Sequence, residues 1–199
     1  MRTVSVTGHG EAHRVPDSAV VRVAGVHRAA GVAEALAGSD SAVRQVVATG
    51  REHTTPEQIG STSVQIWPAH DQQGRPIGYE ARHSVTLRCA DIGAAGALLG
   101  ALAESVGDRL QIEGVSLEVR DRSVAEAAAR EAAYVDAVER GRQLAGLAGA
   151  ELGEPQQVVE GGVVELGQPR LLRAAAADVA LEPGEMSVTA AVTVTFQLH

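Results

Sequence analysis

The stretch Tyr79-Glu80-Ala81-Arg82-His83-Ser84-Val85-Thr86-Leu87-Arg88-Cys89 decides the fold class, because its two sets of alternate residues differ in polarity. Alternation with a period of two predicts a β-strand with one buried and one solvated face. The end of the chain repeats the pattern, with one face formed by Val188, Ala190, Val192, Val194, Phe196 and Leu198 and the other by Ser187, Thr189, Thr193, Thr195 and Gln197. Both stretches predict long strands with one side turned to water.

Weaker alternation marks five more strands, which brings the predicted number to seven. These segments lie near residues 4–6, 19–26, 64–66, 115–119 and 156–164.

Helical spacing marks three further stretches. The first has a stripe of Val32, Leu36, Val43, Val46 and Val47 and ends near Gly50. The second begins at Asp91 as N-cap, ends at Gly107, and has a stripe of Ala95, Leu98, Leu99, Leu102 and Val106. The third opens with a capping box from Ser123 to Glu126, and its predicted buried stripe is Ala127, Tyr134, Ala137, Gly141, Leu144 and Ala148.

The order of these elements predicts an α+β fold, an antiparallel-rich sheet covered by helices. A strand–helix–strand–strand unit occurs at residues 17–90 and again at 110–198, joined by the middle helix. We therefore expect one domain over residues 1–199 with an internal pseudo-repeat of elements. The segment 167–184 is long for a connection between strands and is predicted to be mobile.

Composition limits the classes of function. The 199 residues carry a net charge of −8, and all 17 basic residues are arginines without a basic run, which disfavours nucleic acid and anionic membranes as partners. The single cysteine, Cys89, excludes an internal disulfide, and its position among apolar residues predicts a buried, unreactive thiol. No targeting segment and no apolar run long enough to span a bilayer is visible, so we expect a cytoplasmic protein without integral membrane insertion.

The search for chemistry finds no catalytic, cofactor or metal-binding residues. Gly8-His9-Gly10 follows a strand, but a helix does not follow it as a phosphate site requires, and it is interpreted as a turn with positive φ at its glycines. The seven histidines form no metal-binding motif, although His9 and His13 could converge with His27 if the first two strands pair. No serine lies in a nucleophile motif. We expect no enzymatic activity and no cofactor.

Two aromatic-ring residues on strands have local interpretations. His83 shares the apolar face of its strand and is expected to be partly buried and hydrogen-bonded. Trp67 lies on the face opposite Val64 and Ile66 and precedes Pro68, which cannot donate to a strand ladder. Packing in the core is the default interpretation of Trp67, and an anchor at a subunit interface is the alternative.

Four blocks of sequence follow one another in a recognisable order: Val4 to Glu11 with Pro16-Asp17-Ser18-Ala19, then Gly78-Tyr79-Glu80-Ala81 through to Asp91, then the alanine-rich stretch 128–153, and finally Pro183-Gly184-Glu185. Together they resemble the SIMPL-domain family of bacterial, often periplasmic or envelope-associated proteins. The residues that carry the motifs are Gly8, Gly10, Pro16, Asp17, Gly78, Tyr79, Gly149 and Gly153. Arg140-Gly141 departs from the Lys-Ala that is usual in the family.

The resemblance implies an α+β fold, assembly into homo-oligomeric rings or barrels, and no established catalytic residues. The sequence favours a non-enzymatic oligomeric scaffold or interaction protein, linked to stress or envelope physiology, because it assembles no nucleophile, base or metal set. The alternative is an unrecognised enzyme or small-ligand-binding protein with a pocket at a subunit junction, for which His9, His13 and Asp17 form the best polar cluster. For either hypothesis, the sequence identifies no protein partner other than a second copy, and no ligand.

Overall fold

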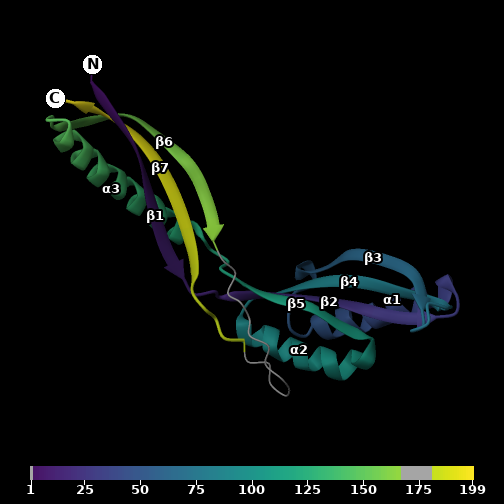
Figure 1. Cartoon of the computed structure of the whole chain (residues 1–199). Coiled ribbons are helices and arrows are strands. Elements are labelled where there is room, and N and C mark those ends of the chain that lie inside the picture. Colours follow the sequence, from purple (N-terminus) through teal and green to yellow (C-terminus); the bar gives the residue numbers. More distant parts are fainter. Residues whose placement is uncertain (1, 167–180) are drawn as a thin grey trace. The chain divides into compact units, whose positions relative to one another are not determined.

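The computed structural model describes residues 2–166 and 181–199. Its elements are β1 (Thr3–Arg14), β2 (Ser18–Ala29), α1 (Val32–Gly50), β3 (Ile59–His70), β4 (Pro76–Cys89), α2 (Ile92–Val106), β5 (Leu110–Glu118), α3 (Ser123–Leu147), β6 (Leu152–Leu166) and β7 (Met186–Leu198) (Figure 1). Short 3-10 turns lie at Pro56–Gln58 and Gly107–Arg109. The α+β class and the predicted order of helices and strands are confirmed.

The strands form two antiparallel sheets in two compact units. The four-stranded unit contains residues 17–118, and the three-stranded unit contains residues 2–16, 119–166 and 184–199. β2, α1, β3 and β4 of the first predicted repeat all lie in the four-stranded unit. The second repeat is divided, because β5 belongs to the four-stranded sheet while β6 and β7 belong to the other.

In the four-stranded unit the strand order is β3-β4-β2-β5, and both α1 and α2 pack on one face (Figure 1). Fully buried Val21 and Leu87 of the sheet meet Val46 of α1 and Leu98 of α2 in a single core. Cys89 lies in this core and is 2% exposed, as predicted. The alternation of β4 therefore separates a core face from a solvated face, as the sequence indicates.

Helix α2 agrees with its sequence signals at both ends. The Asp91 carboxylate accepts a hydrogen bond of 2.6 Å from the Ala94 N–H, and Gly107 follows the helix with φ of 62°. The predicted stripe of Ala95, Leu98, Leu99, Leu102 and Val106 is the buried set. Helix α1 ends at Gly50 as expected, but its first turn is less buried than predicted, because Val32 is exposed and Ala35 is buried instead.

In the three-stranded unit the order is β1-β7-β6, with α3 packed across one face (Figure 1). Gly8 and Gly10 lie inside β1, and neither has a positive φ, so their interpretation as a turn is wrong. A Cβ on Gly8 would lie 2.1 Å from the Ala133 carbonyl oxygen, and one on Gly10 would lie 2.1 Å from that of Ala129. The two glycines let the helix backbone approach the strand closely.

Two predictions about α3 are wrong. The capping box does not form, because Asp121 instead accepts from both the N–H and the hydroxyl of Ser123. The buried stripe is Ala125, Ala129, Ala133, Ala137, Gly141 and Ala145, which shares only Ala137 and Gly141 with the predicted set. Small residues face the sheet because the close approach leaves no room for Tyr134 or Leu144, which are exposed.

Two further expectations concern the pairing of the first two strands and the segment 167–184. β1 pairs with β7 while β2 pairs with β4 and β5, so the first two strands do not pair and cannot bring His9 and His13 to His27 in that way. The segment 167–184, predicted to be mobile, lies mostly outside the described residues. Within the part of the chain that the structure describes, no helix is long and apolar enough to cross a membrane.

Candidate functional site

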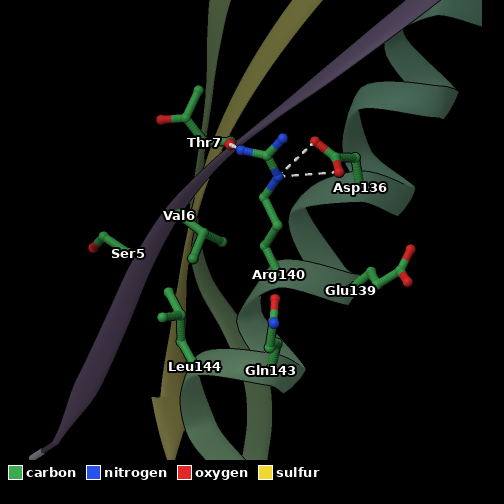
Figure 2. Close-up of a pocket in the computed structure, with 8 residues that line it drawn as sticks. All are labelled: Ser5, Val6, Thr7, Asp136, Glu139, Arg140, Gln143 and Leu144. Atoms are coloured by element: carbon green, nitrogen blue, oxygen red, sulfur yellow. Dashed lines mark hydrogen bonds and ion pairs between the residues drawn. The ribbon is translucent and has the colours of Figure 1, made fainter. Parts of the chain in front are cut away.

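A groove of about 670 Å³ runs between the outer edge of β1 and helix α3 in the three-stranded unit. Figure 2 shows the eight residues that line it: Ser5, Val6, Thr7, Asp136, Glu139, Arg140, Gln143 and Leu144. The Asp136 carboxylate accepts a 2.8 Å hydrogen bond from the main-chain N–H of His9, and Arg140 donates to the Thr7 carbonyl oxygen at 3.3 Å. The two α3 side chains therefore bind the main chain of β1 at its free edge.

Asp136 and Arg140 also bind each other, one helical turn apart, with an ion pair of 2.9 Å. The main-chain N–H of His9, and then Arg140, hold the pKa of the Asp136 carboxyl below its ordinary value. Asp136 is therefore ionised at neutral pH, and its charge is partnered. The two charged side chains of this arrangement are therefore engaged with each other and with the main chain of β1.

The face of the three-stranded sheet away from α3 is polar. Cross-strand hydrogen bonds join Ser5 to Thr195 at 2.8 Å and Thr7 to Thr193 at 2.9 Å. His13 lies 3.9 Å from Glu11 on the same face. In the described chain no group of three or more His, Cys, Asp or Glu side chains is placed to hold a metal ion.

A hollow of about 560 Å³ lies beside this polar face, where β6 bulges. It is lined by His9, Gly10, Glu11, Gly161, Gly162, Thr189, Ala190 and Ala191. Gly162 has φ of 91° at the bulge, and a Cβ on Gly161 would contact Ala191 at 3.3 Å. Small residues thus keep this hollow open.

A serine–histidine contact in the four-stranded unit was not expected from the sequence. The Ser61 hydroxyl lies 2.8 Å from Nε2 of His83, across a register shift between β3 and β4. The prediction that His83 is partly buried and hydrogen-bonded is confirmed. A catalytic triad also needs a group that orients the histidine. None of the hydrogen bonds seen among the described residues joins a carboxylate to this ring, so the pair alone does not make a nucleophile site.

The edge strand β3 exposes apolar side chains. Val64 is 56% exposed and Ile66 is 36% exposed, on the sheet face that α1 and α2 cover elsewhere. Trp67, on the opposite face, is also 36% exposed, so the default prediction that it packs in the core is wrong. Its neighbour across the ladder is Glu80, which pairs with Arg28.

The open face of the four-stranded sheet carries charges that are paired with one another. Glu113 accepts from Arg82 at 3.0 Å and from Ser84 at 2.7 Å, and Arg88 lies 3.1 Å from Glu118. Partly exposed pairs of this kind contribute little to stability. These pairs offset part of the charge on this face, where exposed Arg22 also lies.

The remaining motif residues have structural surroundings. Gly78 has φ of 124° and a Cβ there would meet the Ala29 carbonyl oxygen at 2.3 Å, and Gly149 has φ of 64° just after α3. A Cβ on Gly153 would lie 2.6 Å from the His199 ring. Pro16 lies between β1 and β2, and the Asp17 N–H donates to the Glu118 carbonyl oxygen at 3.1 Å. Tyr79 is partly exposed on β4.

Comparison with known proteins identifies a family and no curated relative. The SIMPL family, described as a protein of unknown function (DUF541), matches residues 4–196. No protein with a curated description matches. Solved structures with local similarity include a hydantoinase/carbamoylase family amidase from Burkholderia ambifaria, with 20% identity, a TM-score of 0.25, and coverage of 58% of this chain and 29% of that one.

A second similar structure is AtUAH in complex with (S)-hydroxyglycine, with 13% identity, a TM-score of 0.25, and coverage of 64% of this chain and 34% of the other. This chain spans about a third of the length of these structures.

Proposed function

The chain belongs to the SIMPL family, and we propose that it is a non-enzymatic protein that assembles with copies of itself through the edge of β3. In this proposal the four-stranded sheet continues into the sheet of a second copy, and Trp67 anchors the junction. A role in stress or envelope physiology and a cytoplasmic location are proposed on sequence grounds alone.

The observation that carries the proposal is the composition of β3. This edge strand has 12 residues and no Asp, Glu, Lys or Arg. Edge strands of monomeric proteins usually carry charges, bulges or proline that prevent pairing with another chain. β3 has a bulge near Thr62 and a proline at position 68, but the segment between them has an uncharged edge.

The other three edge strands of the described sheets are protected differently. β5 carries Glu113 and Glu118, and β6 carries Glu154, Pro155 and Glu160. β1 has its edge occupied by side chains of α3. Among these strands, β3 is therefore the one best suited to pair with another copy.

Antiparallel pairing of two β3 strands about a twofold axis would bring their exposed side chains together. Val64 and Ile66 of each copy would share one face of the joined sheet, with Trp67 on the other. Burying the exposed part of each Val64 and Ile66 side chain is worth roughly 1 kcal/mol, or about 4 kcal/mol for the two copies together. Main-chain hydrogen bonds between the strands would add to this.

Light scattering coupled to gel filtration tests the proposal. We expect the native chain to have a mass of two or more copies of 20.5 kDa. Val64→Lys with Ile66→Lys should return it to one copy without changing its circular dichroism, because lysine on an edge strand opposes pairing. Trp67 is the only tryptophan, so its fluorescence should shift to longer wavelength in the same variant.

Val158→Lys is a matched control on the β6 edge. Val158 is 55% exposed, close to the 56% of Val64, so the substitution changes a similar apolar surface on a different strand. It should leave the mass unchanged. A native chain that stays a monomer at high concentration contradicts assembly, and dissociation by Val158→Lys but not by the β3 variant contradicts the choice of edge.

A further inference from the structure

The outer edge of β1 carries main-chain groups that no strand of its sheet uses. In an antiparallel pair, alternate residues direct both N–H and C=O toward the partner, and the residues between them direct both away and have closer side chains. The short side-chain bonds from Ser5 to Thr195 and from Thr7 to Thr193 mark these as positions of the second kind. The main-chain groups of Ser5, Thr7, His9 and Glu11 therefore face outward.

Helix α3 supplies a substitute for a neighbouring strand at the middle of this edge. A strand added beside β1 would donate to the Thr7 carbonyl oxygen and accept from the His9 N–H. Arg140 and Asp136 already make these two bonds, at 3.3 Å and 2.8 Å. Figure 2 shows the bond from Arg140 to Thr7 and the ion pair between Arg140 and Asp136, which holds both side chains in place. An incoming strand would have to displace both.

We propose that the β1 edge is a latent pairing surface for a second copy of this chain, and that Asp136 and Arg140 keep it closed. The occupant is a second copy because two β1 edges related by a twofold axis present to each other the same outward donors and acceptors, those of Ser5, Thr7, His9 and Glu11. This inference rests on the proposed function in one respect. Copies that assemble through β3 would need the β1 edge blocked, because pairing through β1 would compete with pairing through β3.

Two features distinguish the closed edge from β3. Asp136 and Arg140 come from a helix that is fixed against the same strand by Gly8 and Gly10, so they are held at the edge. On β3, no hydrogen bond observed within the described chain joins an acidic or basic side chain to an outward main-chain group. The titratable and charged groups that face Asp136 are His9 on β1 and Arg140 on its own helix, and both lower the pKa of the Asp136 carboxyl.

The experiment removes the two side chains that occupy the β1 edge, in a variant whose β3 edge cannot pair because it carries lysines. Asp136→Ala with Arg140→Ala is added to the Val64→Lys, Ile66→Lys chain, and the mass is followed by light scattering over a range of concentrations. We expect the added pair of substitutions to shift the mass from one copy to two. Hydrogen exchange should show new protection at the amides of Ser5, Thr7, His9 and Glu11.

Glu139→Ala with Gln143→Ala is the matched control, because these residues line the same groove but make no described bond to β1. It should leave the mass at one copy. If the double alanine variant does not fold, Asp136→Ala alone frees the His9 N–H and should still promote association. A folded Asp136→Ala, Arg140→Ala chain that remains a monomer at every concentration overturns the inference, even where the β3 proposal holds. If Val64→Lys with Ile66→Lys does not change the mass of the native chain, while Asp136→Ala with Arg140→Ala still increases it, the proposed function is wrong and the inference about β1 stands.

Discussion

Replacing Gly8 with alanine tests the packing that defines the three-stranded unit. The new Cβ would lie 2.1 Å from the Ala133 carbonyl oxygen and 2.4 Å from the Ala137 nitrogen, both in the backbone of α3. Since neither atom belongs to a flexible side chain, the whole helix would have to move. Ordinary contacts begin near 3.4 Å, so we expect a displacement of roughly 1 Å or more.

The cost of this movement follows from what α3 buries. Ala129, Ala133 and Ala137 are fully buried against β1 and β7, and a shift of this size removes much of their contact with the sheet. Overpacking of a core costs about 1–3 kcal/mol when side chains can adjust. Because the obstacle here is backbone, we expect Gly8→Ala to lower the free energy of unfolding by about 3 kcal/mol, a large part of the roughly 5–15 kcal/mol of a whole domain.

Urea unfolding followed by far-ultraviolet circular dichroism measures this loss. Gly146→Ala is the control, because Gly146 lies in the same helix and nothing lies within 4 Å of an added Cβ. That substitution should stabilise the helix by about 0.5–1 kcal/mol. If Gly8→Ala changes the free energy of unfolding by less than about 0.5 kcal/mol, α3 does not pack directly on β1 and the reason given for both strand glycines is refuted.

Two further predictions concern titratable groups. Burial raises the pKa of the Cys89 thiol, with a smaller contribution from Asp91, so a thiol reagent should label Cys89 slowly before denaturation and quickly after it, and Cys89→Ala should cost about 1 kcal/mol; rapid labelling of the native chain would contradict its burial. The folded-state pKa of Asp136 is lowered, so its contribution to stability is present above about pH 4 and is lost as the pH falls through the folded value. Asp136→Asn should therefore reduce stability at neutral pH and weaken its decline in acid, and an acid unfolding curve identical to that of the native chain would contradict this.

Periodicity predicted the elements best where one face is strongly apolar. In α2 and β7 the large aliphatic residues recur at the helical or strand spacing, and the buried sets agree with the predicted ones. The caps of α2 were also predicted, because Asp91 and Gly107 act through bonds and dihedral angles within a few residues. Such local causes can be identified in the sequence alone.

Periodicity failed in α3, where alanine occurs on every side of the helix. Ala127 and Ala129 are the same residue type, and only the neighbouring β1 determines which of them is buried. The glycines that permit this packing, Gly8 and Gly10, lie about 120 residues before the helix residues that they contact. The sequence near them gives no sign of this helix, and a Gly-x-Gly pair by itself is typical of a turn. A glycine can be interpreted as a site of close backbone packing only when the element that packs against it is known.

The candidate site was not predicted for a similar reason. Asp136 and His9 are separated by 127 residues, and the role of their bond depends on β1 being an edge strand. The Ser61 contact with His83 depends on a register shift between β3 and β4. Alternation alone predicts that Trp67 packs in the core, since it does not tell which strand faces are covered, whereas the strand order places Trp67 on an uncovered edge.

Charge repulsion between copies opposes self-association, whereas hydrogen bonds and apolar contacts along a strand edge favour it. These two effects act over different distances. The charge of −8 makes copies repel one another. At physiological salt this repulsion is screened beyond about 8 Å. Hydrogen bonds and apolar burial along a strand edge act only at contact, where the outward main-chain groups of the two strands meet. In the proposed assembly the repulsion therefore affects mainly the rate of encounter, while the choice of edge depends on which strand lacks charged residues and lacks side chains that occupy its outward main-chain groups. On both counts that strand is β3 rather than β1.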